Sequence, residues 1–131
     1  MAEAFARAHG DDVVEPVSAG IRPAARISRR TCAVMEEKGI SLASGFSPKN
    51  ISSLDLNQFD VIVNLSEYSL PDTSTMVLKR ALRDPASGDE DAFRDVREDV
   101  EHLVRFLIEH FRLARQWHVN RLYSEECAAA S

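Results

Sequence analysis

The segment from Phe59 to Leu65, which reads Phe-Asp-Val-Ile-Val-Asn-Leu, constrains the fold more than any other part of this chain. Its apolar residues follow one another almost without interruption, which is typical of a parallel β-strand covered on both faces. Segments with helical periodicity lie before and after it. The sequence therefore predicts an α/β domain built on a parallel sheet.

Three segments carry apolar residues at helical spacing. The first covers residues 1–9 and stops at Gly10, and the second covers residues 23–39, where Gly39 ends it. The third begins at Asp89, and acidic residues crowd its start, as the helix dipole prefers. Its apolar side consists of Phe93, Val96, Val100, Leu103, Val104, Leu107 and Phe111.

Two further strands are predicted, Val13 to Val17 and Met76 to Leu82. The first is β-branched, and Pro16 makes it an edge strand or a strand end. Residues 113–131 are less regular than the helix before them. We therefore divide the chain into a domain at 1–112 and a C-terminal extension, a helix or docking tail, at 113–131.

The extension contains two aromatic residues, Trp117 and Tyr123. Aromatic side chains of this kind suit packing into a cleft or against a partner protein. The alternative is that the extension is a helix that covers its own domain. The sequence does not distinguish these two interpretations.

Composition and charge limit the classes of function. A chain of 131 residues with 44% apolar and 28% charged residues is typical of one globular domain. The net charge of −5 argues against nucleic-acid binding, and no apolar run approaches the roughly 20 residues of a membrane span. We expect a cytoplasmic protein, since no leader peptide is recognisable and the two cysteines show no disulfide framework.

No metal or cofactor site is expected. His102, His110 and His118 recur at intervals of eight residues rather than at the i,i+4 spacing that helical metal ligands usually have. Cys32 and Cys127 also lack metal-ligand spacing.

Four stretches of the sequence are each weak signals alone, but their order and spacing together are specific for one protein family. They are Met1 to Arg7, Val17 to Ile21, Ala33 to Ile40, and Asp84 to Gly88 followed by Ala92 to Asp99. In this arrangement the chain resembles the low-molecular-weight protein tyrosine phosphatase superfamily. The sequence Asp-Pro-Ala at position 84, in place of an aromatic-rich loop, is most similar to the thioredoxin-coupled arsenate reductase branch.

The resemblance implies a flavodoxin-like (phosphotyrosine phosphatase I-like) fold, with four parallel strands in the order 2-1-3-4 and helices on both faces. In that family the helix similar to residues 1–9 follows a first strand and a phosphate-binding loop containing Cys, five residues and Arg. The resemblance therefore implies an N-terminally truncated domain in which this central strand and loop are missing.

A missing central strand would leave the strands at Val13 and Phe59 on either side of a gap. Unpaired strand edges invite association, and buried unpaired backbone groups are costly. We expect a homodimer in which a strand or the tail of a second copy fills the gap. The chain's own tail, or a repacked sheet, is the alternative.

The resemblance also assigns roles to three residues. Asp84 matches the family's general acid, and Pro85 after it favours an extended backbone. Glu3 and Ser18 match positions that brace the phosphate-binding loop. From the residues alone, Asp84 is equally a turn aspartate, Glu3 a solvated helix residue and Ser18 a residue that hydrogen-bonds at a strand end.

The two cysteines do not match the family's nucleophile. Cys32 falls inside a predicted helix, and the residue six positions later is Lys38 rather than Arg. We expect a buried, inert thiol there. Cys127 is followed by only four residues and is expected to be an exposed tail thiol. The loop after Leu65 has no cysteine either, so the reductase branch's resolving cysteine is missing there.

We therefore predict a phosphatase-like or arsenate-reductase-like domain that is catalytically inactive as given, with Asp84 as a vestigial acid. One alternative is a fragment of an active phosphotyrosine phosphatase or arsenate reductase whose start is misassigned. The other is a dimeric regulatory or interaction module that reuses the scaffold, because a fold does not by itself define a function.

Overall fold

The computed structural model describes residues 1–85 and 88–130, with side chains up to Trp117 and at Arg121. In this part of the chain three α-helices occur: α1 (Ala2–Gly10), α2 (Arg29–Glu36) and α3 (Glu90–Ala130). Two strands, β1 (Val61–Asn64) and β2 (Met76–Lys79), pair in parallel. Two 3-10 helices, η1 (Ile51–Ser53) and η2 (Leu56–Gln58), precede β1. The α/β class with a parallel sheet is thereby confirmed.

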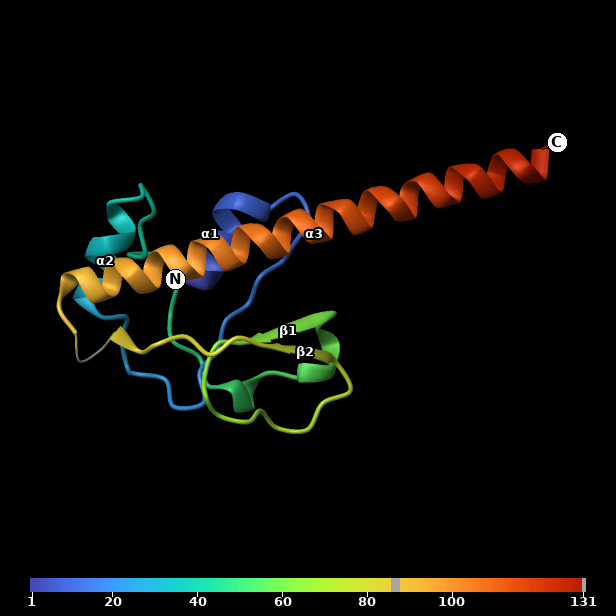
Figure 1. The fold of residues 1–131 in the computed structure, drawn as a ribbon. Helices are drawn as coiled ribbons and strands as arrows, with labels where there is room; N and C mark the ends of the chain where they lie inside the picture. The colour runs from blue at the N-terminus through green and yellow to red at the C-terminus, as the bar shows by residue number, and fades with distance from the viewer. Residues whose placement is uncertain (86–87, 131) are drawn as a thin grey trace.

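The helices pack against one another beside the strand pair (Figure 1). α3 is the central element, because both α1 and α2 pack on it. Their shared core contains Phe5 from α1, Met35 from α2, and Val100, Val104 and Ile108 from α3. At Gly10 a Cβ atom would lie 2.7 Å from Ile108 Cδ1, so α1 comes this close to α3 only because residue 10 has no side chain.

The strand predicted at Val13 to Val17 is wrong among the described residues. Its first two backbone N–H groups, those of Val13 and Val14, donate to Gly10 O at 3.0 and 2.9 Å and so extend the end of α1. Pro16 has no N–H to donate to a sheet. The only bridge formed nearby in the described chain is a parallel one between Gly20 and Asn50.

The predicted strand at Phe59 to Leu65 is confirmed as β1, although its apolar residues are only half-buried rather than covered on both faces. The predicted strand at Met76 to Leu82 is confirmed as β2 for its first four residues, all of them exposed. Pairing beyond β2 continues through Arg80 N–H, which donates to Asn64 O at 2.8 Å.

The second helix is shorter than predicted, because Ser28 sets its start. The Ser28 backbone is extended, and its Oγ accepts a hydrogen bond from Thr31 N–H at 3.1 Å, which is an N-cap. Residues 23–27 are therefore outside α2. Gly39 follows the helix with φ of 74°, a left-handed conformation that favours glycine, so the predicted helix stop is confirmed.

Residues 113–131 were predicted to be less regular than the helix before them. This prediction is wrong for residues 113–130, because α3 continues without a break to Ala130. No glycine or proline follows Gly88, and alanine, arginine, glutamine and glutamate favour helix. Figure 1 shows the last part of α3 projecting away from the other elements. The division of the chain at residue 112 remains a prediction.

An ion-pair network joins α2 to α3. Glu37 accepts hydrogen bonds from Arg94 Nη2 at 2.8 Å and from Arg97 Nη1 at 2.5 Å. Arg97 is buried, and its Nη1 also donates to Val34 O at 2.8 Å. The hydrogen bonds from Arg94 and then Arg97 lower the pKa of Glu37 from 4.5 to about 2.

This network predicts a defined acid sensitivity. Because the folded-state pKa of Glu37 is lowered, its stabilising contribution is complete above pH 4.5 and disappears as the pH falls toward about 2. We expect Glu37→Gln to flatten the dependence of the unfolding free energy on pH within this window, measured by urea titration at several pH values. The neighbouring Glu36→Gln is the control, and an equal flattening there would contradict the assignment to Glu37.

Candidate functional site

Glu3 and Ser18, fifteen residues apart in the chain, are in direct contact. Glu3 is buried on α1 with 7% of its surface exposed. Its Oε2 accepts a hydrogen bond from Ser18 N–H at 3.2 Å and another from Ser18 Oγ. Its Oε1 accepts from Arg7 Nη2 at 2.5 Å. The interpretation of Glu3 as a solvated residue is therefore wrong: its carboxylate fixes the chain near Ser18 against α1.

Asn64 organises the loop that follows β1. It is buried, and its amide nitrogen donates to Tyr68 O at 2.7 Å. Its Oδ1 accepts from Ser66 N–H at 3.0 Å and from Ser66 Oγ at 2.7 Å. The Arg22 guanidinium lies 5.9 Å from the centre of the Tyr68 ring, which brings the segment after Gly20 to this loop.

Asp84 is exposed and lies in the segment without regular secondary structure that follows β2. Leu82 N–H donates to Leu65 O at 3.0 Å, so this segment leaves the sheet beside the loop that Asn64 organises. Because β1 and β2 are parallel, their carboxyl ends meet at one edge, where ligands of open α/β sheets usually bind. Residues 86 and 87 of the Asp84 loop lie outside the described residues.

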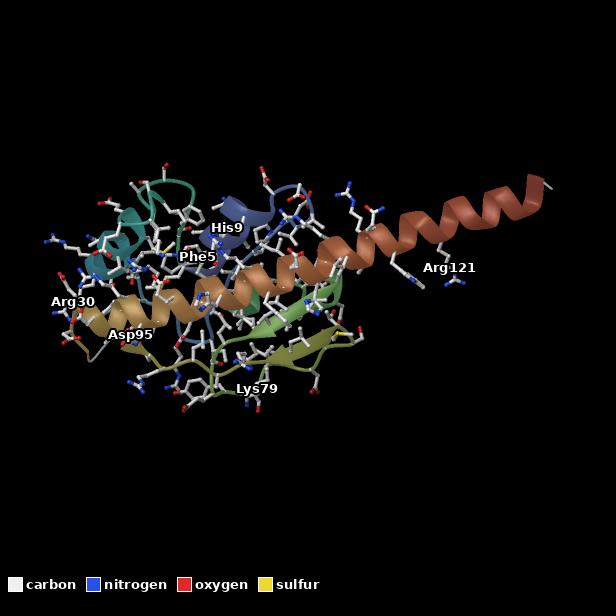
Figure 2. The ribbon with its side chains drawn as sticks, turned by 45° about the horizontal axis from the view of Figure 1, so that its top comes forward. Phe5, His9, Arg30, Lys79, Asp95 and Arg121 are labelled. Carbon is white, nitrogen blue, oxygen red and sulfur yellow. The ribbon has the colours of Figure 1, made fainter. Side chains whose placement is uncertain are left out.

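Beyond Asp84, the loop is held to α2. Arg30 Nη1 donates to Gly88 O at 2.6 Å, and the Arg30 guanidinium lies 5.9 Å from the centre of the Phe93 ring. Figure 2 shows Arg30 near the beginning of α3. This contact fixes the end of the Asp84 loop relative to two helices.

Cys32 is half-buried on α2 and packs against the core. Lys38, six residues later, pairs with Glu98 at 3.0 Å and with Glu101 at 3.6 Å. Its ammonium group is therefore engaged by α3 carboxylates, and the helical backbone after Cys32 forms no anion-binding loop. The thiol is half-buried rather than buried, and its lack of reactivity remains a prediction. The side chains of His118, Tyr123 and Cys127 lie outside the described residues.

No metal centre is found in the described part of the chain, since no three His, Cys, Asp or Glu residues gather to hold an ion. Within the same residues, none of the helices combines the length and the apolar character that a membrane span requires. Among the described residues, His9 Nε2 is a buried side-chain nitrogen that makes no hydrogen bond. It lies 3.6 Å from Glu101 Oε2.

In open α/β sheets ligands bind outside the carboxyl ends of the strands, and in this structure the loops after β1 and β2 meet at that edge. Residues 1–118 match the low molecular weight phosphotyrosine protein phosphatase family, and the chain belongs to this family.

The similar proteins are named as arsenate reductases. A putative arsenate reductase from Halobacterium salinarum is 29% identical over 103 residues, which cover 77% of this chain and 72% of the relative. The arsenate reductase of Archaeoglobus fulgidus superposes with a TM-score of 0.72 at 26% identity, covering 82% and 87% of the two chains. An arsenate reductase in the phosphate binding state gives 0.74 at 28% identity, covering 84% and 86%. The resemblance read from the sequence is confirmed.

The structure brings Glu3 and Ser18 together and places Asp84 at the carboxyl edge of the sheet. The roles of all three residues remain predictions. Asn64 was missed from the sequence, although an asparagine that ends an apolar strand and is followed by serine is a recognisable signal for a structured loop.

Proposed function

We propose that this chain is a phosphatase-like or arsenate-reductase-like domain whose 131 residues do not by themselves catalyse turnover by the family's cysteine mechanism. The observation that carries the proposal is the environment of Cys32, the one cysteine side chain described. It lies on a helix and against the core, and the residue six positions later is an ion-paired lysine.

The chemistry shows why this environment is unsuitable. Attack on phosphorus or arsenic by this route needs a thiolate within a ring of backbone N–H groups. It also needs an arginine fork to hold the equatorial oxygens. Asp84 would supply the proton for the leaving oxygen, and Glu3 with Ser18 would brace the loop that carries the thiolate. These 131 residues thus contain the supporting groups, while Cys32 is followed at the sixth position by Lys38 rather than by arginine.

Arsenate is the oxyanion that the similar proteins favour, because the relatives and solved structures are named as arsenate reductases. Reduction of arsenate requires two electrons, and a cysteine relay delivers them by disulfide formation. The loop from Leu65 to Tyr68 contains no cysteine for that relay. Arsenate binding is therefore a better expectation for this scaffold than arsenate reduction.

We expect no hydrolysis of an aryl phosphate, and no thioredoxin-dependent reduction of arsenate, above the rate in buffer. Both assays use the 131-residue chain, with Asp84→Asn and Cys32→Ser as comparisons, and neither substitution is expected to change the result. Turnover that disappears on Cys32→Ser would overturn the proposal, because Cys32 would then be the nucleophile.

The alternative of a misassigned start has a separate test. The DNA directly upstream of Met1 either encodes an in-frame Cys, five residues and Arg, or it does not. If it does, the extended chain should turn over substrate, and Asp84→Asn should lower kcat in that chain by about 10²–10⁴-fold, as loss of a general acid does. An unchanged kcat would show that Asp84 is not the general acid.

The second candidate is a cytoplasmic interaction module that forms a homodimer through strand or tail exchange. Two exposed apolar regions favour it, the residues Met76, Val77 and Leu78 of β2 and the residues Phe106, Leu113 and Trp117 of α3. Exposed apolar clusters of this kind mark interaction surfaces more often than single exposed residues do.

A further inference from the structure

Two segments of this chain are basic and contain no acidic residue, residues 16–35 and residues 73–83. The whole chain has a net charge of −5, so this positive charge is a local feature. We call the arginines of these segments, together with the backbone that joins them within each segment, the arginine edge. It consists of six exposed residues, Arg22, Arg26, Arg29, Arg30, Arg80 and Arg83.

The two segments meet at the loop that follows β1. Arg80 N–H donates to Asn64 O at 2.8 Å, and the Asn64 amide nitrogen donates to Tyr68 O at 2.7 Å. The Arg22 guanidinium lies 5.9 Å from the centre of the Tyr68 ring. Arg22 and Arg80 therefore adjoin the same short loop.

The segments meet again near the start of α3. Arg30 Nη1 donates to Gly88 O at 2.6 Å, and Gly88 lies four residues beyond Asp84. Figure 1 shows both segments running toward the end of the molecule at which α2 and α3 begin. The arginine edge thus extends from the loop after β1, past Asp84, to α3.

The chain does not neutralise the arginine edge with its own carboxylates. In the part of the chain that the structure describes, the ion pairs involve other basic residues, namely Arg7, His9, Lys38, Arg94, Arg97, Arg105 and Arg112. The loops that adjoin the edge contain fewer carboxylates than the edge has guanidinium groups: Glu67, Asp72 and Asp84. An excess of positive charge therefore faces solvent here.

The backbone of the first segment is also available for pairing. Residues 21–27 form no helix or strand, and among the described residues none of their backbone groups makes a hydrogen bond. Parallel pairing ends directly before them, at the bridge between Gly20 and Asn50. The segment thus offers N–H and C=O groups between its arginines, except at Pro23, which has no N–H.

We propose that the arginine edge binds an acidic segment of a partner polypeptide in an extended conformation. A guanidinium group donates two parallel hydrogen bonds to a carboxylate, and such charge-assisted bonds are stronger than neutral ones. The partner's backbone pairs with residues 21–27, as in strand addition at a sheet edge. Residues 22–30 span at most about 30 Å when extended, which corresponds to about nine residues of the partner.

Other anions fit the arginine edge less well. A single oxyanion engages one or two arginines and leaves the others unused. A nucleic acid or an anionic membrane carries charge over a larger extent, so it would also face the acidic remainder of a chain whose sequence pI is 5.3. A short acidic peptide extends no further than the edge. This interaction goes beyond the proposed function, because neither a thiol nor an oxyanion takes part in it.

Binding is tested on the full chain by the fluorescence anisotropy of a labelled peptide of about ten residues in which Glu and Ala alternate. We expect saturable binding with a Kd of about 1–100 µM at low ionic strength. The same peptide with Gln in place of Glu should not bind, because it keeps the backbone and loses the charge. Absence of binding of the Glu peptide at protein concentrations up to about 1 mM would overturn the proposal.

The position of the site is tested with two matched pairs of substitutions. Arg26→Glu with Arg29→Glu alters the arginine edge, and Arg105→Glu with Arg121→Glu makes the same change of net charge on α3. We expect the first pair to weaken binding by about tenfold or more and the second by less than about twofold, with circular dichroism confirming that both variants fold. Equal losses would mean that the peptide responds to net charge alone, which would refute the assignment to the edge.

The second segment has its own test. Arg80→Glu with Arg83→Glu should also weaken binding of the Glu peptide by about tenfold or more, since both segments contribute to one site. Unchanged binding in this variant would show that the two segments do not form one site.

Competition identifies the class of partner. Inorganic phosphate, single-stranded DNA of about ten nucleotides and vesicles containing an anionic lipid are compared with the unlabelled Glu peptide at equal concentrations of negative charge and about 150 mM salt. We expect the peptide to displace the label at the lowest concentration. More effective displacement by phosphate, DNA or vesicles would assign the edge to that anion and overturn the proposal. The turnover assays of the proposed function do not use this peptide, so the two proposals fail independently.

Discussion

Met35→Ala is expected to lower the free energy of unfolding by about 2–5 kcal/mol. Met35 is completely buried on α2, at the place where α1, α2 and α3 share one core with Phe5, Val100 and Val104. Removing its thioether chain loses the transfer free energy of the buried atoms and leaves a cavity that three helices can only partly close. Urea denaturation followed by circular dichroism measures the loss.

Met76 provides a control of the same residue type. It lies on β2 with 62% of its surface exposed, so Met76→Ala should change the free energy of unfolding by no more than about 0.5 kcal/mol. Equal losses for Met35→Ala and Met76→Ala would mean that the three-helix core does not dominate the stability. A larger loss at Met76 would mean that the sheet face is covered in solution.

Glu3→Ala is expected to cost about 1–3 kcal/mol of unfolding free energy. The Glu3 carboxylate accepts hydrogen bonds from Ser18 N–H and Ser18 Oγ, and it is paired with Arg7. Its removal leaves the Ser18 donors without this acceptor and Arg7 without its counter-charge. The link between α1 and the segment that carries Ser18 should loosen in consequence.

A double-mutant cycle with Ser18→Ala isolates this contact. We expect a coupling free energy of about 0.5–3 kcal/mol between Glu3 and Ser18, since their side chains share a hydrogen bond. Glu15→Ala, at an exposed acidic residue, is the control and should be nearly neutral. Strict additivity of Glu3→Ala and Ser18→Ala would show that the contact does not hold the candidate site together.

The elements that local sequence determines were predicted well. α3 follows from the long helical spacing that begins near Phe93, and Asp89 caps it by accepting a hydrogen bond from Ala92 N–H at 3.0 Å. β1 follows from its apolar run, and the end of α2 follows from Gly39. In each case the signal lies within a few residues of the element, where propensity and capping act.

The elements that depend on a neighbour were predicted poorly. A strand exists only where another strand accepts its hydrogen bonds, and Val13 to Val17 has the composition of a strand without such a neighbour among the described residues. The contact between Glu3 and Ser18 is similar, because no spacing rule indicates which distant donor a buried carboxylate will meet.

The sequence by itself determined the α/β class, the family resemblance, and the fact that Lys38 rather than an arginine stands six positions after Cys32. These properties are local or depend on order along the chain. Only the tertiary structure decided that Glu3 is buried against Ser18, that Lys38 is held by α3 carboxylates, and that Phe106, Leu113 and Trp117 of α3 are exposed. Burial and pairing depend on which surfaces meet, and local periodicity does not specify that choice.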